Sequence, residues 1–493
     1  MSLNFRSSFQ PLLLSGVIAW LAYTLYGLSL GYSYWLDELF SVSVAQFPLR
    51  EQMTIILNDV HPPFFQILLY FWTSIWGDGE LAARSLSAVC VVPVFYTIYR
   101  MSRHLEATQA TWFVVLIFSN WLVYNYSQEV RSYGLLFGLS ALSYYLFLRN
   151  ERRAIFIILA AVSLTHFFGT LLAVLCLVWI FLSSLRDRST LALSAVTLLA
   201  VISWPAYYFF SANESQLAGG GFWISSTGVD VAYKAVSATF PLAGVFFRLI
   251  QSKYPALTIF LFVPFVALAA FLIYSYYRRA ELKVRRWIVK SSYLYCTTVM
   301  CVLFISEHTP VSTDRNFIVI VMPGTFLAAA AFAGGMKFLP SRLAFLVVSA
   351  TIVLAGQFDV YTTLARRFMP QQDWKGVAQK VSDLESAGKI SGIYLFSPIP
   401  IHDDLRLRHF IRYRGHYFGE SENLKPVWLG NLSTLPEKSA VYFGQVKGEK
   451  VRPDYCENFI TRELEALNIP FQAFFARQYR ACGNGYIIIG TAE

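Results

Sequence analysis

The sequence predicts an α-helical polytopic membrane protein with a small extramembrane α/β domain at its C-terminal end. Of its 493 residues, 56% are hydrophobic and 14% are charged, whereas charged residues make up about 25% of a typical soluble domain. Mean hydropathy is +0.48. Beyond Asp359 charge, Gly and Pro increase and no apolar run is long enough to span. We therefore expect a transmembrane domain at 1–358 and an extracytoplasmic α/β domain at 359–493.

A helix needs about 20 apolar residues to cross a hydrocarbon core roughly 30 Å thick, and on this criterion we expect about 11 spans. They are residues 11–30, 81–100, 110–125, 131–149, 154–166, 167–185, 190–210, 255–277, 287–306, 317–336 and 342–358. The apolar run 62–76 would reach only about 22 Å as a helix. We place it in the outer interface, which Trp72 and Trp76 favour; a short span paired with 81–100 is the alternative.

Lys and Arg gather in every second connection between these runs. The clusters are Arg100/Arg103, Arg149/Arg152/Arg153, Arg186/Arg188, Arg278 through Lys290, and Lys337/Arg342. Because cytoplasmic loops carry the excess of Lys and Arg, these connections and the N-terminus are predicted to be cytoplasmic. An odd number of spans then leaves the C-terminus outside. Cys456 and Cys482 could form a disulfide there if the compartment is oxidising.

A second set of ionisable residues falls at the opposite, outer ends of the spans. It consists of Asp37, Glu38, Asp59, His61, Arg84, Glu129, Arg131, His166, Glu307, His308, Asp314 and Arg315. Such groups are costly near hydrocarbon and commonly mark function. Each also has a structural explanation: Asp37 could cap a helix, Glu129 could pair with Arg131, His166 could be an interface residue and Arg315 a flanking charge. Their joint presence on one side favours an active site.

The C-terminal region carries signals of a small α/β fold. Asp373 is a plausible N-cap for a helix with Val377, Val381 and Leu384 on one face. Strands are predicted at 392–396, 440–445, 471–478 and 486–490, with a hairpin turn at 482–485 joining the last two. The segment 211–245 contains Gly219-Gly220-Gly221-Phe222-Trp223 and is interpreted as a loop, either a mobile flap over the site or a passive connector.

Five short motifs resemble, in order, those of the superfamily C glycosyltransferases. They are Asp37-Glu38, His61-Pro62-Pro63-Phe64-Phe65, Ala83-Arg84-Ser85-Leu86-Ser87-Ala88, Gln128-Glu129-Val130-Arg131-Ser132-Tyr133 and Thr165-His166-Phe167-Phe168-Gly169. Within the superfamily they look most like bacterial relatives of the protein O-mannosyltransferases and the lipid A aminoarabinose transferase. The resemblance covers roughly residues 10–190 and extends faintly to Arg315-Asn316-Phe317. Val130 stands where relatives often have Ala.

The resemblance implies inverting transfer of a sugar from a polyprenyl-phosphate carrier to an acceptor on the outer face, in a bacterial inner membrane. A hydroxyl acceptor needs a carboxylate to take its proton; Asp37 is the first candidate and Glu38 the second. The phosphate leaving group needs cations, for which His61, Arg84, Arg131 and Arg315 are candidates. Glu129 and His166 could bind sugar hydroxyls or a metal, with Mg or Mn as possible divalent cofactors. The acceptor could be a lipid, glycan or protein.

Two other classes of function compete with this hypothesis. A flippase or transporter of lipid-linked sugars would favour polar residues near the bilayer midplane and interrupted helices in paired halves, whereas the ionisable residues here lie toward one face. A non-catalytic anchor that presents the C-terminal domain would tolerate replacement of Asp37 and Arg131.

Overall fold

The computed structural model describes most of the helical region and parts of the C-terminal region. The described residues are 9–211, 228–240, 255–308, 311–336, 351, 354, 374–397, 401, 403–418, 424–428, 431, 434–443, 470–475 and 485–489. The chain divides into two compact units. Unit 1 comprises Met1–Ser29, Asp59–Phe65 and Arg84–Leu364, and unit 2 comprises Leu30–Asn58, Gln66–Ala83 and Ala365–Glu493. The boundary expected at residue 359 stays a prediction; unit 2 additionally takes in two segments from the first 83 residues.

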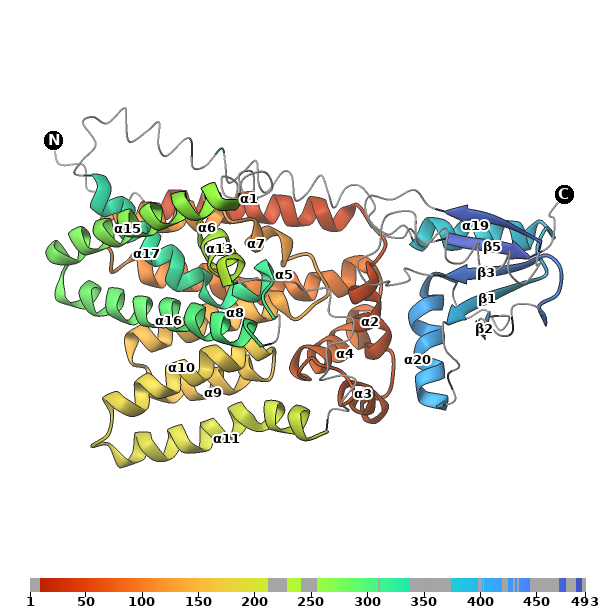
Figure 1. Cartoon of the computed structure of the whole chain (residues 1–493), viewed down its shortest axis with the longest axis horizontal. Coiled ribbons are helices and arrows are strands. Elements are labelled where there is room, and N and C mark those ends of the chain that lie inside the picture. The colour runs from red at the N-terminus through yellow and green to blue at the C-terminus, as the bar shows by residue number, and fades with distance from the viewer. Residues whose placement is uncertain are drawn as a thin grey trace. The chain divides into compact units, whose positions relative to one another are not determined.

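Unit 1 is a helical bundle (Figure 1). Its elements are α1 (Phe9–Ser29), α5 (Glu80–Ser102, whose first residues belong to unit 2), α6 (Ala107–Phe118), α7 (Trp121–Asn125), α8 (Tyr133–Arg149), α9 (Arg152–Ser163), α10 (Phe167–Ser183), α11 (Arg188–Ser211), α13 (Gly228–Thr239), α15 (Pro255–Arg279), α16 (Leu282–Ser306), the 3-10 helix η2 (Asp314–Ile320) and α17 (Val321–Gly335).

The apolar helices confirm a polytopic membrane protein. Six described helices are long and apolar enough to cross a bilayer: Phe9–Ser29, Glu80–Ser102, Arg188–Ser211, Phe260–Arg279, Leu282–Ser306 and Asp314–Gly335. Shorter apolar helices accompany them, among them α6 and α10. The number of spans stays a prediction, and the expected span 342–358 lies almost entirely outside the described residues.

The span expected at 110–125 is wrong as a continuous helix, because the chain breaks at Asn120. The Asn120 side chain accepts a hydrogen bond from the Leu122 backbone N–H at 3.0 Å and so caps the start of α7. Its amide also donates to the Ala238 carbonyl at 2.7 Å. Asn120 therefore ends α6 and ties the break to α13.

The centre of unit 1 is the segment formed by η2 and α17. In its most apolar stretch 94% of the residues are buried. The corresponding shares are 22% in α1 and 6% in α15, so these two helices lie at the periphery. Small residues line α17, and a Cβ added at Gly334 would overlap the Leu272 carbonyl of α15. Such residues let backbones approach closely. Phe332 of α17 stacks on Trp112 of α6, with ring centroids 4.3 Å apart.

Helix α13 departs from the loop expected between residues 211 and 245. Residues Gly228–Thr239 are helical, and Val231, Ala235 and Ala238 are buried in the same core as α17. Their spacing of three and four residues places them on one face. This part of the segment is a packed helix, so the loop interpretation is wrong for it. The glycine run at 219–221 lies outside the described residues.

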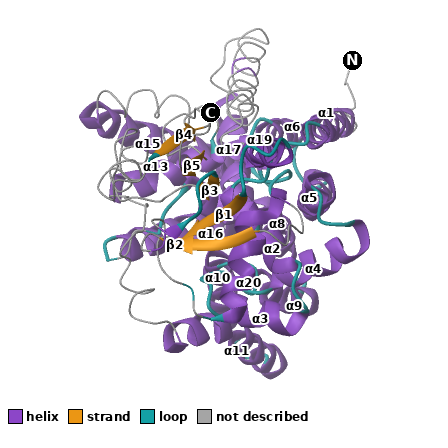
Figure 2. Cartoon of the chain, turned by 90° about the vertical axis from the view of Figure 1, so that its right-hand side faces the viewer, coloured by secondary structure: helices purple, strands orange, loops and turns teal. Residues whose placement is uncertain are grey.

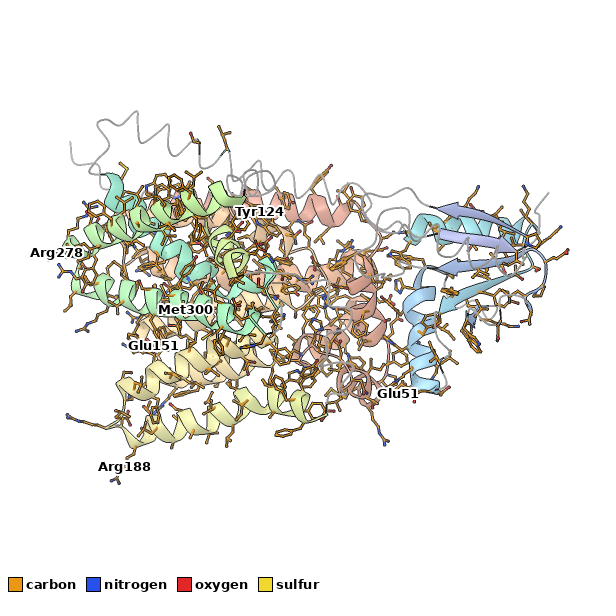
Figure 3. The ribbon with its side chains drawn as sticks, in the orientation of Figure 1. Glu51, Tyr124, Glu151, Arg188, Arg278 and Met300 are labelled. Carbon is orange, nitrogen blue, oxygen red and sulfur yellow. The ribbon has the colours of Figure 1, made fainter. Side chains whose placement is uncertain are left out.

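The basic connections meet at one end of unit 1. Figure 3 shows Glu151, Arg188 and Arg278 at the same end of the bundle, and Arg152 forms an ion pair with Asp187. His104 joins them: burial lowers its pKa, and four nearby cations lower it further. These cations are Lys283, Arg149, Arg103 and Arg100. Connections predicted to share the cytoplasmic side are therefore neighbours in space.

Unit 2 combines short helices with a mixed sheet. The helices are α2 (Leu36–Ala45), α3 (Leu49–Ile56), α19 (Trp374–Ser386), α20 (Asp404–Gly415) and the 3-10 helix η4 (His416–Phe418). Helix α4 (Phe64–Trp76) lies mostly in this unit. Its 13 residues reach about 20 Å at a rise of roughly 1.5 Å per residue. This length suits the interfacial placement, which itself stays a prediction.

The sheet has the strand order β2-β1-β3-β5-β4, and Figure 2 shows the strands following one another in this order. The strands are β1 (Gly392–Ser397), β2 (Leu424–Trp428), β3 (Ser439–Phe443), β4 (Phe471–Phe475) and β5 (Gly485–Ile489). β1 pairs in parallel with β2 and β3, and β5 pairs antiparallel with β3 and β4. Helix α20 connects β1 to β2, and helix α19 contacts β5.

The α/β fold expected for the C-terminal region is thus confirmed. The helix after Asp373 forms with Val377 and Val381 buried, and all four expected strands are present to within three residues at either end. The sequence reasoning missed β2 and α20. Four of the twelve residues of α20 are Arg, which lowers its mean hydropathy, and Pro426 interrupts the β2 pattern. Cys456, Cys482 and the hairpin turn lie outside the described residues.

Candidate active site

The site in unit 1 begins at the loop before α4, where Asp59, His61 and Arg131 form a chain of hydrogen bonds. His61 Nδ1 lies 3.0 Å from Asp59 Oδ2, and His61 Nε2 lies 3.0 Å from Arg131 Nη2. A guanidinium group can only donate, so Nε2 must accept and the imidazole proton sits on Nδ1, facing the carboxylate. His61 is therefore held as one neutral tautomer between an anion and a cation.

The proline pair after His61 fixes where this loop lies. Pro62 and Pro63 precede α4, and the backbone N–H of Phe64 donates to the Leu164 carbonyl at 3.1 Å. Leu164 is the C-cap residue of α9. This bond ties the His61 loop to the connection between α9 and α10, which carries His166.

His166 is the N-cap of α10. Its Nδ1 accepts the Phe168 backbone N–H at 3.2 Å, so the ring proton sits on Nε2. Burial, followed by nearby charges that include those of Arg315 and Arg131, lowers the pKa of His166 well below its ordinary value. The ring lies 6.2 Å from that of His61, centroid to centroid. His166 is thus a buried, neutral capping residue beside the Asp59–His61–Arg131 chain.

Aromatic rings connect His166 to Arg315 of η2. The Tyr133 ring lies 5.5 Å from the His166 ring, and the Arg315 guanidinium carbon lies 5.1 Å from the Tyr133 centroid. Tyr126 lies 5.0 Å from Tyr133. Burial raises the pKa of Tyr126 well above 10, and the Glu129 charge raises it further. The phenol therefore stays protonated next to that carboxylate.

Glu129 and Arg131 lie on the connection between α7 and α8 and are buried, with 6% exposure each. The Asn125 amide donates to Glu129 Oε2 at 3.5 Å, and the Ser87 hydroxyl of α5 donates to the Glu129 carbonyl. Arg84 is 8% exposed and precedes Ser87 by three residues on α5, which places it on the same helix face. All three charged groups are thus desolvated near one connection.

Two helix N-termini add positive potential to the site. Arg131 directly precedes the N-cap of α8, and His166 is the N-cap of α10. Tyr133, the first residue of α8, contacts the His166 ring, so the two helix starts are close. Helix N-termini carry unpaired N–H groups and a partial positive charge that favour anions. Combined with Arg131 and Arg315, this arrangement suits a phosphate.

The carboxylates expected to supply the base lie in unit 2, in the first turn of α2. Glu38 is 2% exposed, and its Oε2 accepts the Trp35 backbone N–H at 3.1 Å, which caps its own helix. Asp37 is partly exposed, and its carbonyl accepts from the Ser41 hydroxyl. Glu38 therefore caps its own helix, and the choice of Asp37 as the base stays a prediction.

The structure therefore brings most of the predicted unit 1 residues together. His61, Arg131, His166, Arg315 and Glu129 are linked through the contacts above, and Arg84 lies on an adjoining helix face. The sequence reasoning gave no role to Asp59 or Tyr126. The spacing Asp-Val-His could have indicated the first, because a carboxylate two residues before a His can reach its Nδ1.

The candidate metal ligands do not form a chelating group within the described residues. No cluster of three or more His, Cys, Asp and Glu side chains suited to a metal ion occurs there. His166 uses Nδ1 for its cap and His61 uses both ring nitrogens in hydrogen bonds. A divalent cofactor therefore stays a prediction, and no step below depends on one.

Taken together, the fold is that of a polytopic integral membrane protein with an extramembrane mixed sheet. No protein-family model matches the chain, and no curated protein matches it. Solved structures do. Among them are two crystal structures of ArnT from Cupriavidus metallidurans, each at 12% identity. The apo state matches with a TM-score of 0.54 over 99% of both chains. The state bound to undecaprenyl phosphate matches with 0.52, over 97% of this chain and 98% of the other.

This likeness establishes the fold over the whole chain, including the C-terminal region where the sequence motifs ended. The fold expected from the five motifs in residues 10–190 is thus matched by these two structures.

Proposed function

We propose that the chain is an integral-membrane glycosyltransferase that transfers a sugar from a polyprenyl-phosphate donor to an acceptor on the outer face of the membrane. The observation that carries the proposal is the likeness, over 97% of the chain, to the ArnT structure bound to undecaprenyl phosphate. The buried cations at two helix N-termini in unit 1 support it, because they suit a phosphate.

In the proposed reaction an acceptor hydroxyl attacks the anomeric carbon of the donor sugar. Asp37 takes the hydroxyl proton as the new bond forms, and the bond from the anomeric carbon to the phosphate oxygen breaks with inversion. A phosphodiester with one negative charge thereby becomes a phosphate monoester that gains a second. Positioned cations stabilise such developing charge most effectively where water is excluded.

Arg131 and Arg315 are the proposed phosphate ligands, with Arg84 as a third cation. Arg is suited to this role because its planar fork can make two parallel bonds to phosphate oxygens. His61 holds Arg131 through Nε2, and Asp59 in turn fixes the His61 tautomer. Glu129, whose Oε2 accepts from Asn125, is proposed to bind sugar hydroxyls.

The distribution of charge supports the proposed outer location. α8 runs from Tyr133, beside the site, to Arg149, which belongs to the basic end of unit 1. The site and the basic connections therefore lie at opposite ends of a 17-residue helix. Since basic connections are retained in the cytoplasm, we place the site on the outer face and the protein in a bacterial inner membrane.

The decisive experiment measures transfer of radiolabelled sugar from a panel of polyprenyl-phosphate donors in proteoliposomes. Wild type is compared with Asp37→Asn, and Glu38→Gln is the matched control, since Gln retains an oxygen that can accept the Trp35 N–H. General-base catalysis contributes roughly 10²–10⁴-fold, so Asp37→Asn should lose at least about 100-fold while Glu38→Gln retains most activity.

Three other outcomes would change the assignment. Equal loss in both variants would show that the first turn of α2 matters as a unit. Full activity of Asp37→Asn would remove Asp37 from the mechanism. Movement of the donor lipid between leaflets, with no sugar transfer or donor hydrolysis, would indicate that the protein is a flippase and not an enzyme.

A further inference from the structure

Helix α2, which carries Asp37, packs on an element from the far end of the chain. The Ser43 hydroxyl lies 3.1 Å from His409 Nε2 of α20. The Phe40 ring meets the His409 ring edge to face at 5.3 Å, and His409 stacks in parallel on Tyr413 at 6.0 Å. Phe40 lies three residues after Asp37, so α20 packs against α2 within one helical turn of that carboxylate.

Two arginines of α20 contact the C-terminal end of α2 and the helix that follows it. Arg412 Nη1 donates to the carbonyl of Gln46, the C-cap of α2, at 2.8 Å. The Arg412 guanidinium also lies over the Phe47 ring, 4.3 Å from its centroid. Arg408 makes two bonds to Glu51 of α3, at 2.9 and 3.3 Å; Figure 3 labels Glu51. A cation at a helix C-terminus also complements the helix dipole.

The N-terminal end of α2 is held by η4, which follows α20. The Tyr417 hydroxyl accepts the Tyr34 backbone N–H at 2.6 Å and donates to Glu80 Oε1 at 3.1 Å. The Tyr34 side chain is fully buried, and its own hydroxyl donates to the Asp78 carbonyl at 2.7 Å. One hydroxyl from the C-terminal region thus joins the residues before α2 to the start of α5.

We infer that α20 and η4 are positioning elements that set the orientation of α2, with Tyr417 and Arg412 as the positioning residues for the Asp37 carboxylate. The inference rests on the proposed function. It assigns the C-terminal region a part in catalysis, because both ends of the helix that bears the base depend on side chains nearly 400 residues downstream.

Hydrogen exchange of peptides covering residues 35–46 tests the contact without any assay of activity. The full-length protein is compared with Tyr417→Phe, which keeps the ring and removes the hydroxyl, and with Arg412→Ala. Arg406→Ala is the control, since Arg406 lies on the same helix and is exposed. We expect exchange in these peptides to accelerate at least threefold in the first two variants and to remain unchanged in the control. Unchanged exchange in both variants would overturn the inference.

A double-mutant cycle with Asp37→Asn then tests whether the residues act through Asp37. Tyr417→Phe should lower kcat about tenfold with little change in the KM for donor, and should cause almost no further loss of residual turnover in the Asp37→Asn background. Equal fractional losses in both backgrounds, or a change confined to KM, would contradict positioning. If wild type transfers no sugar, the proposed function fails, while hydrogen exchange still decides whether α20 and η4 order α2.

Discussion

His61 Nε2 accepts a hydrogen bond from Arg131 Nη2 at 3.0 Å, although both residues were expected from the sequence to be cations that bind the donor phosphate. The contact leaves His61 neutral and directs its Nδ1–H to Asp59. Burial raises the pKa of Asp59, but the hydrogen bond from His61 and the positive charge of Arg131 outweigh it and place the pKa below its ordinary value. The carboxylate is therefore ionised at neutral pH and fixes the imidazole.

Removing this carboxylate should weaken binding of the donor phosphate. Hydrogen bonds to charged groups contribute about 1.5–3 kcal/mol, so Asp59→Ala should lower kcat/KM for the polyprenyl-phosphate donor roughly 10- to 100-fold. Asp59→Asn should lose less, because its amide oxygen can still accept from Nδ1–H. Asp187→Asn, at the basic end of unit 1, is the control; a similar loss there would indicate a general effect of charge.

The stability of the folded protein should fall as the pH drops below about 6.5, partly because of His166. Its pKa is lowered in the folded state by burial first, so below the unfolded pKa the unfolded chain binds a proton that the folded chain does not. One such proton changes the free energy of unfolding by at most about 1.4 kcal/mol per pH unit. The stabilisation is present above pH 6.5 and is lost as the pH falls toward the folded pKa.

Thermal unfolding in detergent at pH 7.5 and 5.5 measures this effect. His166→Asn keeps an N-cap side chain but cannot titrate, so its loss of Tm between the two pH values should be smaller than that of wild type. An equal loss would assign the pH dependence to other groups. Asp59 does not contribute to the change between these two pH values, because the stabilisation that its lowered pKa provides is lost only below its ordinary pKa of 3.8.

Arg315 should depend on Tyr133 for its placement. The guanidinium lies over the ring at 5.1 Å, and such a contact contributes about 0.5–2 kcal/mol. Tyr133→Leu should therefore raise the KM for donor roughly 3- to 30-fold. Tyr133→Phe, which retains the ring, should stay close to wild type. If the Phe variant lost as much as the Leu variant, the hydroxyl rather than the ring face would be the important feature.

The packing of α8 against α5 should not tolerate a methyl group at Gly138. A Cβ there would overlap the Cys90 carbonyl oxygen, and overpacking costs typically about 1–3 kcal/mol. Gly138→Ala should lower the Tm in detergent by several degrees. Gly335→Ala is the matched control, because its Cβ would meet Leu272 at an ordinary 3.6 Å. Equal stability of both variants would show that α8 and α5 can separate without cost.

Much of the architecture was predictable from local pattern. Long apolar runs indicated the membrane helices, and short strand signals indicated β1, β3, β4 and β5. Two helices were missed: α20 is rich in Arg, and α13 lies in a segment whose glycine run was interpreted as part of a loop. The span expected at 110–125 is interrupted at Asn120, because the Asn120 side chain caps the start of a new helix within an apolar stretch.

The sequence by itself determined the class of protein, the side on which the charges gather and the residue types available for chemistry, because hydropathy and charge act over short stretches of chain. The tertiary structure decided which of these residues touch. It paired His61 with Arg131 across 70 residues and Tyr34 with Tyr417 across 383. Hydrogen-bond geometry between distant segments exists only once the helices have packed, so no local pattern could have revealed that His61 accepts from Arg131 or that the C-terminal region contacts α2.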